Sequence, residues 1–368
     1  MTSPACIVQV VDTLSVGGAE RVAVSLANAL AARGYDSHLL VSRAMGPLSE
    51  AVSPQVHVAC AERTWRFDRR GMRMMADYIE ASCADVVHSH SHHPSYLVRF
   101  VRRLCRTRFL HVVHDHHGLA LGDWKVGVYD WLMLRHVDAY LAVTQALRER
   151  AARLLALPPE RCLFVSNGVE LPPRTPPWQG PPTVVHVANL RLLKNHATAL
   201  HAAARLRERL PGLRWLCVGA IPDGPSPYMD QVRSLLSLLR LAGCVELLGA
   251  RNDVRAILAE AHVGVLTSDV EGLPMAVLEY MAAQLPVVMT DVGEGPIILR
   301  EARAGFVVPP RAPDRFADVL WDIFRNMPEA RRMGERGRVH VENHFSVDAM
   351  VGRIGSLYEK LLAGRRSA

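Results

Sequence analysis

The stretch CIVQVVDTLSVGGAERVAVSLANALAARG, residues 6–34, contains the unit from which we expect the whole fold to be built. Its first part is an apolar run typical of a buried strand, and its second part has apolar residues at helical spacing. The helical pattern ends at Gly34, a residue type favoured just after a helix. A strand followed directly by a helix predicts an α/β protein with a parallel sheet.

The same alternation of strand-like and helix-like segments continues on both sides of a proline-rich segment near the middle of the chain. Proline continues neither a helix nor a sheet, so this segment predicts an extended linker. We therefore predict two doubly wound, Rossmann-like α/β domains whose strands end at a shared cleft, where ligands bind in such sheets. The predicted parts are domain 1–170, linker 171–183, domain 184–345 and a C-terminal helix, 346–368, that packs on the first domain.

A composition of 49% hydrophobic and 21% charged residues is typical of a globular protein. A chain of 368 residues is too long for one ordinary hydrophobic core and predicts two domains. No apolar run reaches the roughly 18 residues that a membrane span requires, and the N-terminus lacks the features of a signal peptide. The seven cysteines are scattered without a Cys-x-x-Cys pair, which predicts neither disulfides nor a zinc site. We expect a cytoplasmic protein.

Two glycines, Gly17 and Gly18, follow the first strand and open the first helix. Backbone N–H groups at such a helix start can meet a phosphate, although a tight turn would also favour glycine. The segment is not Gly-x-Gly-x-x-Gly, and the second strand ends without an acidic residue for a ribose. A dehydrogenase is therefore disfavoured.

Histidines cluster after two strands of the first half, in HSHSHHP (88–94) and HVVHDHHG (111–118). One interpretation is a metal site with several imidazoles and Asp115 as ligands, as in a metal-dependent phosphoesterase. The Asp-x-Asp and Gly-Gly-Gly-His segments expected of the DHH-type phosphoesterases are missing. The other interpretation is a polar acceptor pocket in which His88, His90 and His92 position a hydroxyl group.

Cations follow the first strand of the second half, in NLRLLKNH (189–196). Asn189, Arg191 and Lys194 would lie at the carboxyl end of that strand, where cations can hold a diphosphate and the charge that develops when it leaves. The alternative is a solvated loop. The chain has only three lysines, at positions 125, 194 and 360, which makes Lys194 conspicuous.

Two glutamates with seven residues between them, Glu271 and Glu279, lie in SDVEGLPMAVLEYMAAQLPVV (268–288). The segment predicts a loop and then a helix that starts near Gly272 or Pro274, with its first N–H groups in the cleft. Glu271 at the helix start can accept hydrogen bonds from sugar hydroxyls. Glu279, inside the helix among apolar neighbours, suits the two hydroxyls of a ribose, because a buried unpaired carboxylate would be costly.

In this order the motifs resemble the retaining glycosyltransferases of family 4, which have the GT-B fold. The resemblance spans nearly the whole chain, and its most specific part is the pair of glutamates at 271 and 279. Supporting matches are GGAERV (17–22), SNGVE (166–170), NLRLLKNH (189–196), DVGEGP (291–296), AGFVVPP (304–310) and HFSVDAM (344–350).

The resemblance implies roles for individual residues, with the acceptor bound by the first domain and a nucleotide sugar by the second. Gly17 and Gly18 match the loop near the donor diphosphate. Lys194 matches the phosphate-binding lysine, Glu271 the glutamate that contacts the donor sugar, and Glu279 the ribose ligand. The backbone along the sugar and phosphate corresponds to Gly272, Leu273, Pro274 and Met275.

Two departures from the family pattern concern catalytic residues. Asn189 stands where the family has an arginine, and Arg191 is the candidate to replace it. The family's histidine near the reacting sugar follows a strand of the first domain, and both His114 and His117 fit that place, with His114 ranked slightly ahead. The implied enzyme is a metal-independent, retaining hexosyltransferase without a cofactor.

The acceptor is expected to be a carbohydrate, a lipid-linked molecule or a small molecule, in the synthesis of a cell-surface polysaccharide, a glycolipid or a glycoside. A basic surface of the first domain, with arginines in SYLVRFVRRLCRTRF (95–109) and Trp65 and Phe67 among further arginines, predicts peripheral contact with an anionic membrane. A solvated helix face is the alternative. No aromatic and basic motif indicates nucleic acid. A catalytically inactive binding protein of the same fold is the remaining hypothesis.

Overall fold

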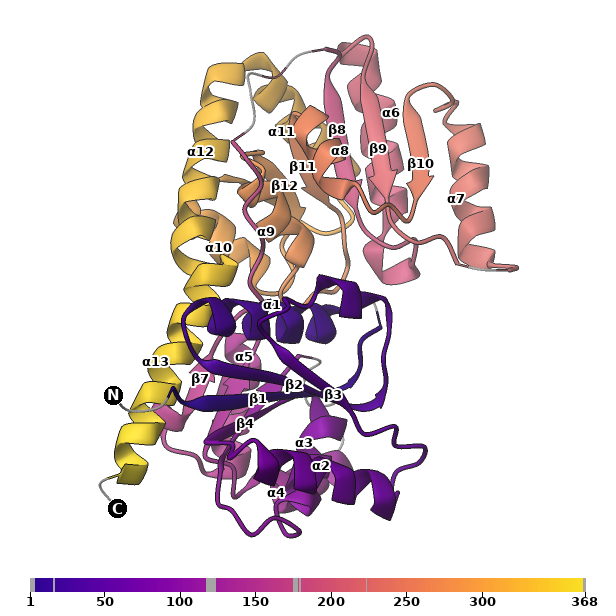
Figure 1. The fold of residues 1–368 in the computed structure, drawn as a ribbon. Coiled ribbons are helices and arrows are strands. Elements are labelled where there is room, and N and C mark those ends of the chain that lie inside the picture. The colour runs from indigo at the N-terminus through magenta and orange to yellow at the C-terminus, as the bar shows by residue number, and fades with distance from the viewer. Residues whose placement is uncertain are drawn as a thin grey trace. The chain divides into compact units, whose positions relative to one another are not determined.

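The computed structural model describes residues 4–15, 17–116, 124–174, 178, 180–222 and 224–366, and the chain divides into two compact units. Unit 1 is Met1–Gly168 together with Val347–Ala368, and unit 2 is Val169–Ser346. Each unit contains one parallel sheet with helices packed against it (Figure 1). The predicted class, two doubly wound α/β domains, is confirmed.

Unit 1 has a seven-stranded sheet in the order β3-β2-β1-β4-β5-β6-β7. Its strands are β1 Cys6–Thr13, β2 Asp36–Ala44, β3 His57–Cys60, β4 Val86–His90, β5 Leu110–Asp115, β6 Ala139–Ala142 and β7 Cys162–Phe164. Its helices are α1 Gly18–Ala32, η1 Pro47–Ala51, α2 Arg69–Ala81, α3 His92–Val101, α4 Trp124–Leu134, α5 Gln145–Leu155, η2 Pro159–Arg161 and α13 Val347–Arg366. The strand order reverses between β1 and β4, which is where sheets of this type bind ligands.

Alternating side chains of β1 explain why helices cover both faces of this sheet. Ile7 packs in a cluster with residues of α1 and α13, including Leu26 and Tyr358. Val8 points to the other face, where it packs with residues of α2 and α3 such as Met75. The C-terminal helix α13 is therefore part of the core of unit 1.

Unit 2 has a six-stranded sheet in the order β10-β9-β8-β11-β12-β13. Its strands are β8 Thr183–Val187, β9 Arg214–Val218, β10 Val245–Gly249, β11 Val263–Leu266, β12 Val287–Thr290 and β13 Gly305–Val308. Its helices are η3 Leu192–Lys194, α6 His196–Arg209, α7 Pro227–Leu238, α8 Val254–Glu260, α9 Met275–Ala282, α10 Gly295–Ala302, α11 Pro313–Arg325 and α12 Met327–His344. The central strands β8 and β11 are adjacent and parallel, so the loops that follow them meet at one edge.

Tyr280 fixes α9 on the centre of this sheet. Its buried hydroxyl accepts a hydrogen bond from the Val187 amide at 2.5 Å and donates one to the Val265 carbonyl at 3.1 Å. The ring lies against Gly264, where an added Cβ would come within 2.3 Å of the Tyr280 Cγ. A glycine on β11 therefore lets α9 approach closely, and this contact sets the position of the start of α9.

The first part of the predicted linker packs on unit 2. The Val169 amide donates to the Phe345 carbonyl at 2.8 Å, and the buried Arg338 of α12 donates to the Pro172 carbonyl at 2.7 Å. The chain thus joins unit 2 two residues before the linker was expected to begin. Within the described ranges, no helix is both long and apolar enough to span a membrane.

Replacing Gly305 with alanine is predicted to destabilise unit 2. An added Cβ would lie 1.9 Å from the Val287 carbonyl oxygen of the paired strand β12, and a backbone atom cannot rotate away. Overpacking of this kind costs roughly 1–3 kcal/mol, so the melting temperature should fall by about 2–10 °C. Gly352→Ala in α13 is the control, because an added Cβ there meets nothing within 4 Å. Equal melting temperatures for both variants would contradict the prediction.

Candidate functional site

A pocket of about 450 Å³ lies in unit 2 where β8, β9 and β11 end. It combines main-chain turns with a small number of charged side chains, the usual character of a ligand pocket. Its lining residues are Val187, Ala188, Asn189, Lys194, Val218, Gly219, Ala220, Ala250, Arg251, Val254, Leu266, Glu271, Leu273, Pro274, Met275, Ala276 and Glu279. Lys194 and both predicted glutamates thus lie around one pocket.

Lys194 is held by the turn that joins β8 to α6. Asn195 follows it in the left-handed conformation, with φ 46° and ψ 54°, which asparagine tolerates better than most residues. The Asn195 side-chain oxygen accepts a hydrogen bond from the Thr198 amide at 3.2 Å and so caps α6. The same residue therefore turns the chain and starts the helix.

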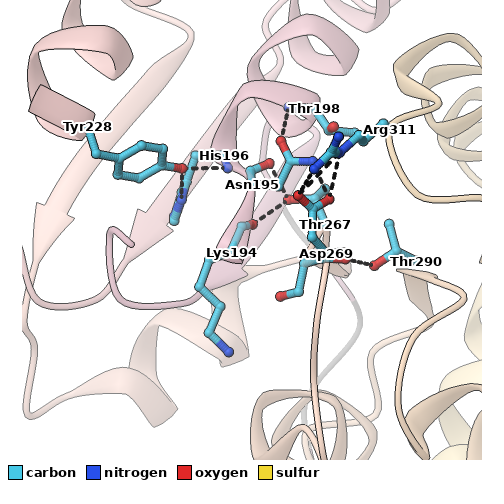
Figure 2. Close-up of polar contacts among 10 residues, drawn as sticks. Lys194, Asn195, His196, Thr198, Tyr228, Thr267, Asp269, Thr290 and Arg311 are labelled. Atoms are coloured by element: carbon cyan, nitrogen blue, oxygen red, sulfur yellow. Dashed lines mark hydrogen bonds and ion pairs between the residues drawn. The ribbon is translucent and has the colours of Figure 1, made fainter. Parts of the chain in front are cut away.

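Asp269, in the loop after β11, fixes this turn from the other side (Figure 2). Its carboxylate accepts hydrogen bonds from the Asn195 amide at 2.8 Å and from Arg311 at 2.8 Å. The Arg311 guanidinium, and then the hydrogen bond from Asn195, hold the pKa of Asp269 below its ordinary value despite partial burial. The Thr267 hydroxyl adds bonds to the Lys194 and Asn195 carbonyls at 3.2 and 3.0 Å. The backbone of the lysine turn is thus fully tied to the neighbouring loop.

Glu271 pairs directly with Lys194 inside the pocket. The Lys194 Nζ lies 2.6 Å from the Glu271 Oε1, and the Ser268 hydroxyl donates to the same oxygen at 2.6 Å. The side chains are 28% and 9% exposed, so this pair is much better shielded than a surface ion pair. Thr290 in turn donates to the Ser268 carbonyl at 2.6 Å and holds that loop. In this arrangement an anion and a sugar hydroxyl would each find a charged partner already in place.

The start of α9 forms the wall next to this ion pair. Pro274 stands at the N-cap position and has no side-chain oxygen to cap the helix, so the first N–H groups face the pocket, which Met275 and Ala276 line. Glu279 lines the same pocket from within the helix and is half-buried. Glu271 therefore contributes to this site from the loop before α9, and Glu279 contributes from the helix itself.

Three of the residues predicted to bind the nucleotide sugar, Asn189, Arg191 and Gly272, either make structural contacts or lie away from the pocket lining. Asn189 lines the pocket, but its side-chain oxygen accepts a hydrogen bond from the Ala220 amide at 2.9 Å and joins two loops. Arg191 is exposed, and the Gly272 carbonyl accepts a hydrogen bond from the Glu294 amide at 2.9 Å. Neither Arg191 nor Gly272 is among the described residues that line the pocket. Their roles in donor binding stay predictions.

Sequence reasoning missed Arg251 and Val254, which line the pocket from the segment after β10. Arg251 is oriented by Asp253 through contacts of 2.6 and 2.7 Å. Their position directly after a strand was the available signal. It also missed Asp269 and Arg311, because residues 42 positions apart show no pattern that a single sequence reveals.

Unit 1 has its own pocket, of about 330 Å³, at the carboxyl ends of β1 and β4. Its lining residues are Val11, Asp12, Ala19, Glu20, His90, Ser91, His92, His93 and Pro94. Burial lowers the pKa of His92, but the hydrogen bond to Asp115 at 3.2 Å and the charge of that carboxylate more than offset it and raise the pKa above its ordinary value. Two acids and three imidazoles give this pocket the chemistry of a hydroxyl-binding site.

His88 and His114 are completely buried and are not among the described residues lining this pocket. His88 faces the Tyr358 hydroxyl at 2.5 Å, and His114 faces the Val165 carbonyl at 3.4 Å. The structure thus places His88 in the interior rather than on an acceptor surface. The catalytic role predicted for His114 stays a prediction, and His117 lies outside the described residues.

Gly17 and Gly18 lie at the start of α1 but do not belong to the described lining of either pocket. Gly17 has an ordinary extended conformation, with φ −140°, so its glycine is not required by a left-handed turn. Instead, a Cβ added at Gly17 would lie 2.2 Å from an oxygen of the Glu20 carboxylate. The predicted contact of both glycines with a diphosphate stays a prediction.

The basic surface of unit 1 includes a hollow of about 280 Å³. Arg99, Arg102 and Arg103 line it together with His111 and His136. Trp65 and Phe67 are exposed beside Arg66. Contact of this surface with a membrane stays a prediction.

Comparisons with known proteins match both units. The family described as "Glycosyltransferase Family 4" matches residues 16–172, and "Glycosyl transferases group 1" matches residues 181–326. N-acetyl-alpha-D-glucosaminyl L-malate synthase of Bacillus anthracis is 22% identical over 369 residues, which is 95% of each chain.

Two solved structures share the fold over almost the full length. A glycosyltransferase from Rickettsia africae superposes with a TM-score of 0.84 at 18% identity, covering 98% of this chain and 99% of the other. Anabaena Alr3699/HepE in complex with UDP has a TM-score of 0.79 at 16% identity, with 97% and 100% covered. At these identities the likeness establishes the fold, and the chemistry depends on the residues described above.

Proposed function

Because this chain belongs to the glycosyltransferases of family 4, which use nucleotide sugars, we propose that it moves a sugar from a nucleoside diphosphate to an acceptor hydroxyl with retention of the anomeric configuration. The observation that carries the proposal is the arrangement around the unit 2 pocket. A lysine, two glutamates and the open N-terminus of α9 line one space of about 450 Å³.

Glu279 is proposed to hold the ribose. Its carboxylate can accept hydrogen bonds from both hydroxyls of a vicinal diol, and its place within α9 keeps it at a fixed distance from the start of that helix. HepE was solved with UDP, which supports a uridine diphosphate donor, with guanosine diphosphate as the alternative. The diphosphate would then lie toward Lys194 and the N–H groups of α9, where negative charge is favoured.

Lys194 is proposed to exchange one anionic partner for another when the donor binds. In this structure its ammonium is paired with Glu271. A diphosphate next to Lys194 offers a stronger partner, and Glu271 is then available to accept hydrogen bonds from sugar hydroxyls. The exchange leaves neither charge unpaired in a shielded pocket, which keeps the cost of binding low.

The transfer step needs charge stabilisation on the leaving group. The bond between the anomeric carbon and the phosphate oxygen breaks, and its electron pair remains on the diphosphate beside Lys194. The acceptor oxygen forms the new bond on the same face of the sugar, and the acceptor proton passes to the departing phosphate oxygen. Since Lys194 and α9 supply positive potential at this position, we propose that no divalent cation is required at the diphosphate.

The pocket of unit 1 is proposed to bind the acceptor. Asp12, Glu20, His92 and His93 offer acceptors and donors for several hydroxyl groups, which suits a carbohydrate, either free or lipid-linked. Two carboxylates among four polar groups make the site unsuited to an anionic acceptor. This supports a role in the synthesis of a polysaccharide, a glycolipid or a glycoside.

Lys194→Ala is predicted to lower turnover by about 100- to 1,000-fold, because an electrostatic stabiliser of the leaving group is lost. The measurement is donor hydrolysis with the nucleotide sugar that the wild type cleaves fastest in a panel of uridine and guanosine diphosphate sugars. Lys360→Ala, an exposed lysine in α13, is the matched control. A Lys194→Ala enzyme with near-normal turnover would refute the role.

Glu279→Ala is predicted to weaken nucleotide binding by roughly 10- to 100-fold, the size expected for hydrogen bonds to a charged group. The 2′,3′-dideoxy form of the same nucleotide should bind wild type and variant equally, since it has no diol to lose. Calorimetry with uridine and guanosine diphosphates measures both. Glu260→Ala, exposed at the end of α8, should behave as wild type. If the variant discriminates the dideoxy form as strongly as wild type does, Glu279 is not the ribose ligand.

A donor whose anomeric carbon has an axial bond to the diphosphate is predicted to give a product with an axial glycosidic bond. Added Mg²⁺ or Mn²⁺ should leave the transfer rate unchanged. Nuclear magnetic resonance of the product gives the anomeric configuration directly. An equatorial product would exclude retention, and a tenfold stimulation by either cation would exclude metal-independent transfer.

A further inference from the structure

Four histidines of unit 1 lie side by side on one face of the sheet. His88 and His90 are two residues apart on β4, and His114 and His116 are two residues apart at the end of β5, so each pair projects to the same face. His90 is the register partner of His114, which brings the two pairs together. The ring centroids of His114 and His116 are 4.1 Å apart, and those of His88 and His90 are 4.6 Å apart.

One nitrogen of each ring faces an oxygen atom. His88 Nδ1 lies 2.5 Å from the Tyr358 hydroxyl, and His90 Nε2 lies 2.8 Å from the Gln9 Oε1. His114 Nε2 lies 3.4 Å from the Val165 carbonyl, and His116 Nδ1 lies 2.9 Å from Asn167 Oδ1. Oxygen partners on the outer nitrogens are the arrangement that orients histidines around a metal ion, because a ring that donates from one nitrogen keeps a lone pair on the other.

Three of these rings are close enough to hold one metal ion together. One ligand atom each from His88, His90 and His114 lies within 4.8 Å of the other two. Within the described part of the chain, His88 Nε2 and His114 Nδ1 are buried without a hydrogen-bond partner, which is unfavourable for a polar atom. His90 Nδ1 and His116 Nε2 face each other at 3.0 Å, and would repel if both carried lone pairs.

We propose that His88, His90 and His114 bind one divalent metal ion of the kind that imidazole prefers, with Zn²⁺ as the first candidate and His116 as the fourth ligand. The ion gives a partner to both unpartnered nitrogens and removes the repulsion between His90 and His116. Ligand nitrogens of a tetrahedral zinc site lie about 3.4 Å apart, given zinc–nitrogen bonds of ~2.0–2.1 Å. The three ligand atoms, which lie within 4.8 Å of one another, would have to reach this spacing when the ion binds.

Burial supports neutral ligands at this position. His88, His90 and His114 are each at most 1% exposed, and such burial disfavours the charged form of an imidazole. A metal ion binds only such deprotonated nitrogens.

The site would be structural rather than catalytic. Four protein ligands leave no open position for water or substrate. The histidines contact Tyr358 of α13 and Gln9 of β1, and Gln9 Nε2 donates to the Tyr358 hydroxyl at 3.4 Å. The ion would therefore link the last helix to the central strand of unit 1. This inference goes beyond the proposed transfer reaction and gives His114 a structural role in place of the catalytic one expected from resemblance.

The test is metal analysis of the full chain without an affinity tag. After removal of metal with a chelator and dialysis against Zn²⁺ or Co²⁺, the wild type should retain one equivalent, and Zn²⁺ should raise its melting temperature by several degrees. Bound Co²⁺ should give the intense visible absorption of a tetrahedral site. His90→Gln and His114→Gln should retain no metal.

The control is His344→Gln, because His340 and His344 of α12 form a surface pair that could also collect metal. It should retain one equivalent. Loss of metal binding in His344→Gln would overturn the inference. A wild type that retains no metal and melts at the same temperature with and without Zn²⁺ would also overturn it, and would leave a water molecule as the occupant of the cluster. If the His90 and His114 variants do not fold, the cobalt spectrum of the wild type still decides, since a weak octahedral spectrum would equally overturn it.

Discussion

The carboxylate of Asp269 is the constraint on which the unit 2 pocket depends. It accepts hydrogen bonds from the Asn195 side-chain amide and the Arg311 guanidinium, both at 2.8 Å. These bonds join the turn before α6, the loop after β11 and the segment after β13. Without it the left-handed turn at Asn195 would keep its helix cap and the Thr267 hydrogen bonds but lose its link to Arg311. The fixed turn places Lys194 within 2.6 Å of Glu271.

The two units have different chemistry, and the difference follows from how each sheet ends. In unit 2, Tyr280 holds α9 against Gly264. The uncapped N-terminus of α9 and Lys194 line the same pocket, which produces positive potential there. In unit 1, carboxylates and imidazoles line the pocket at the ends of β1 and β4. The first arrangement suits a departing anion, and the second suits neutral hydroxyl groups.

The sequence was sufficient to predict the two parallel sheets and the grouping of Lys194, Glu271 and Glu279, because side chains that follow strands of one parallel sheet must meet at one edge. It was insufficient for His88, since the strand period gives the face of a residue and not its depth. The role of Arg191 stays a prediction, because the residue is exposed and is not among the described residues that line the pocket. The partners Asp269 and Arg311 required the fold itself.

The place of α13 in the core of unit 1 determines the order in which the protein can mature. The apolar face formed by Ile7, Leu26 and their neighbours is completed by Ile354 and Tyr358, which are synthesised after all of unit 2. On the ribosome, unit 2 can close its core while unit 1 still exposes an uncovered sheet face, which is a site for aggregation or chaperone binding. A truncation of only the last 20 or so residues would therefore damage the domain made first.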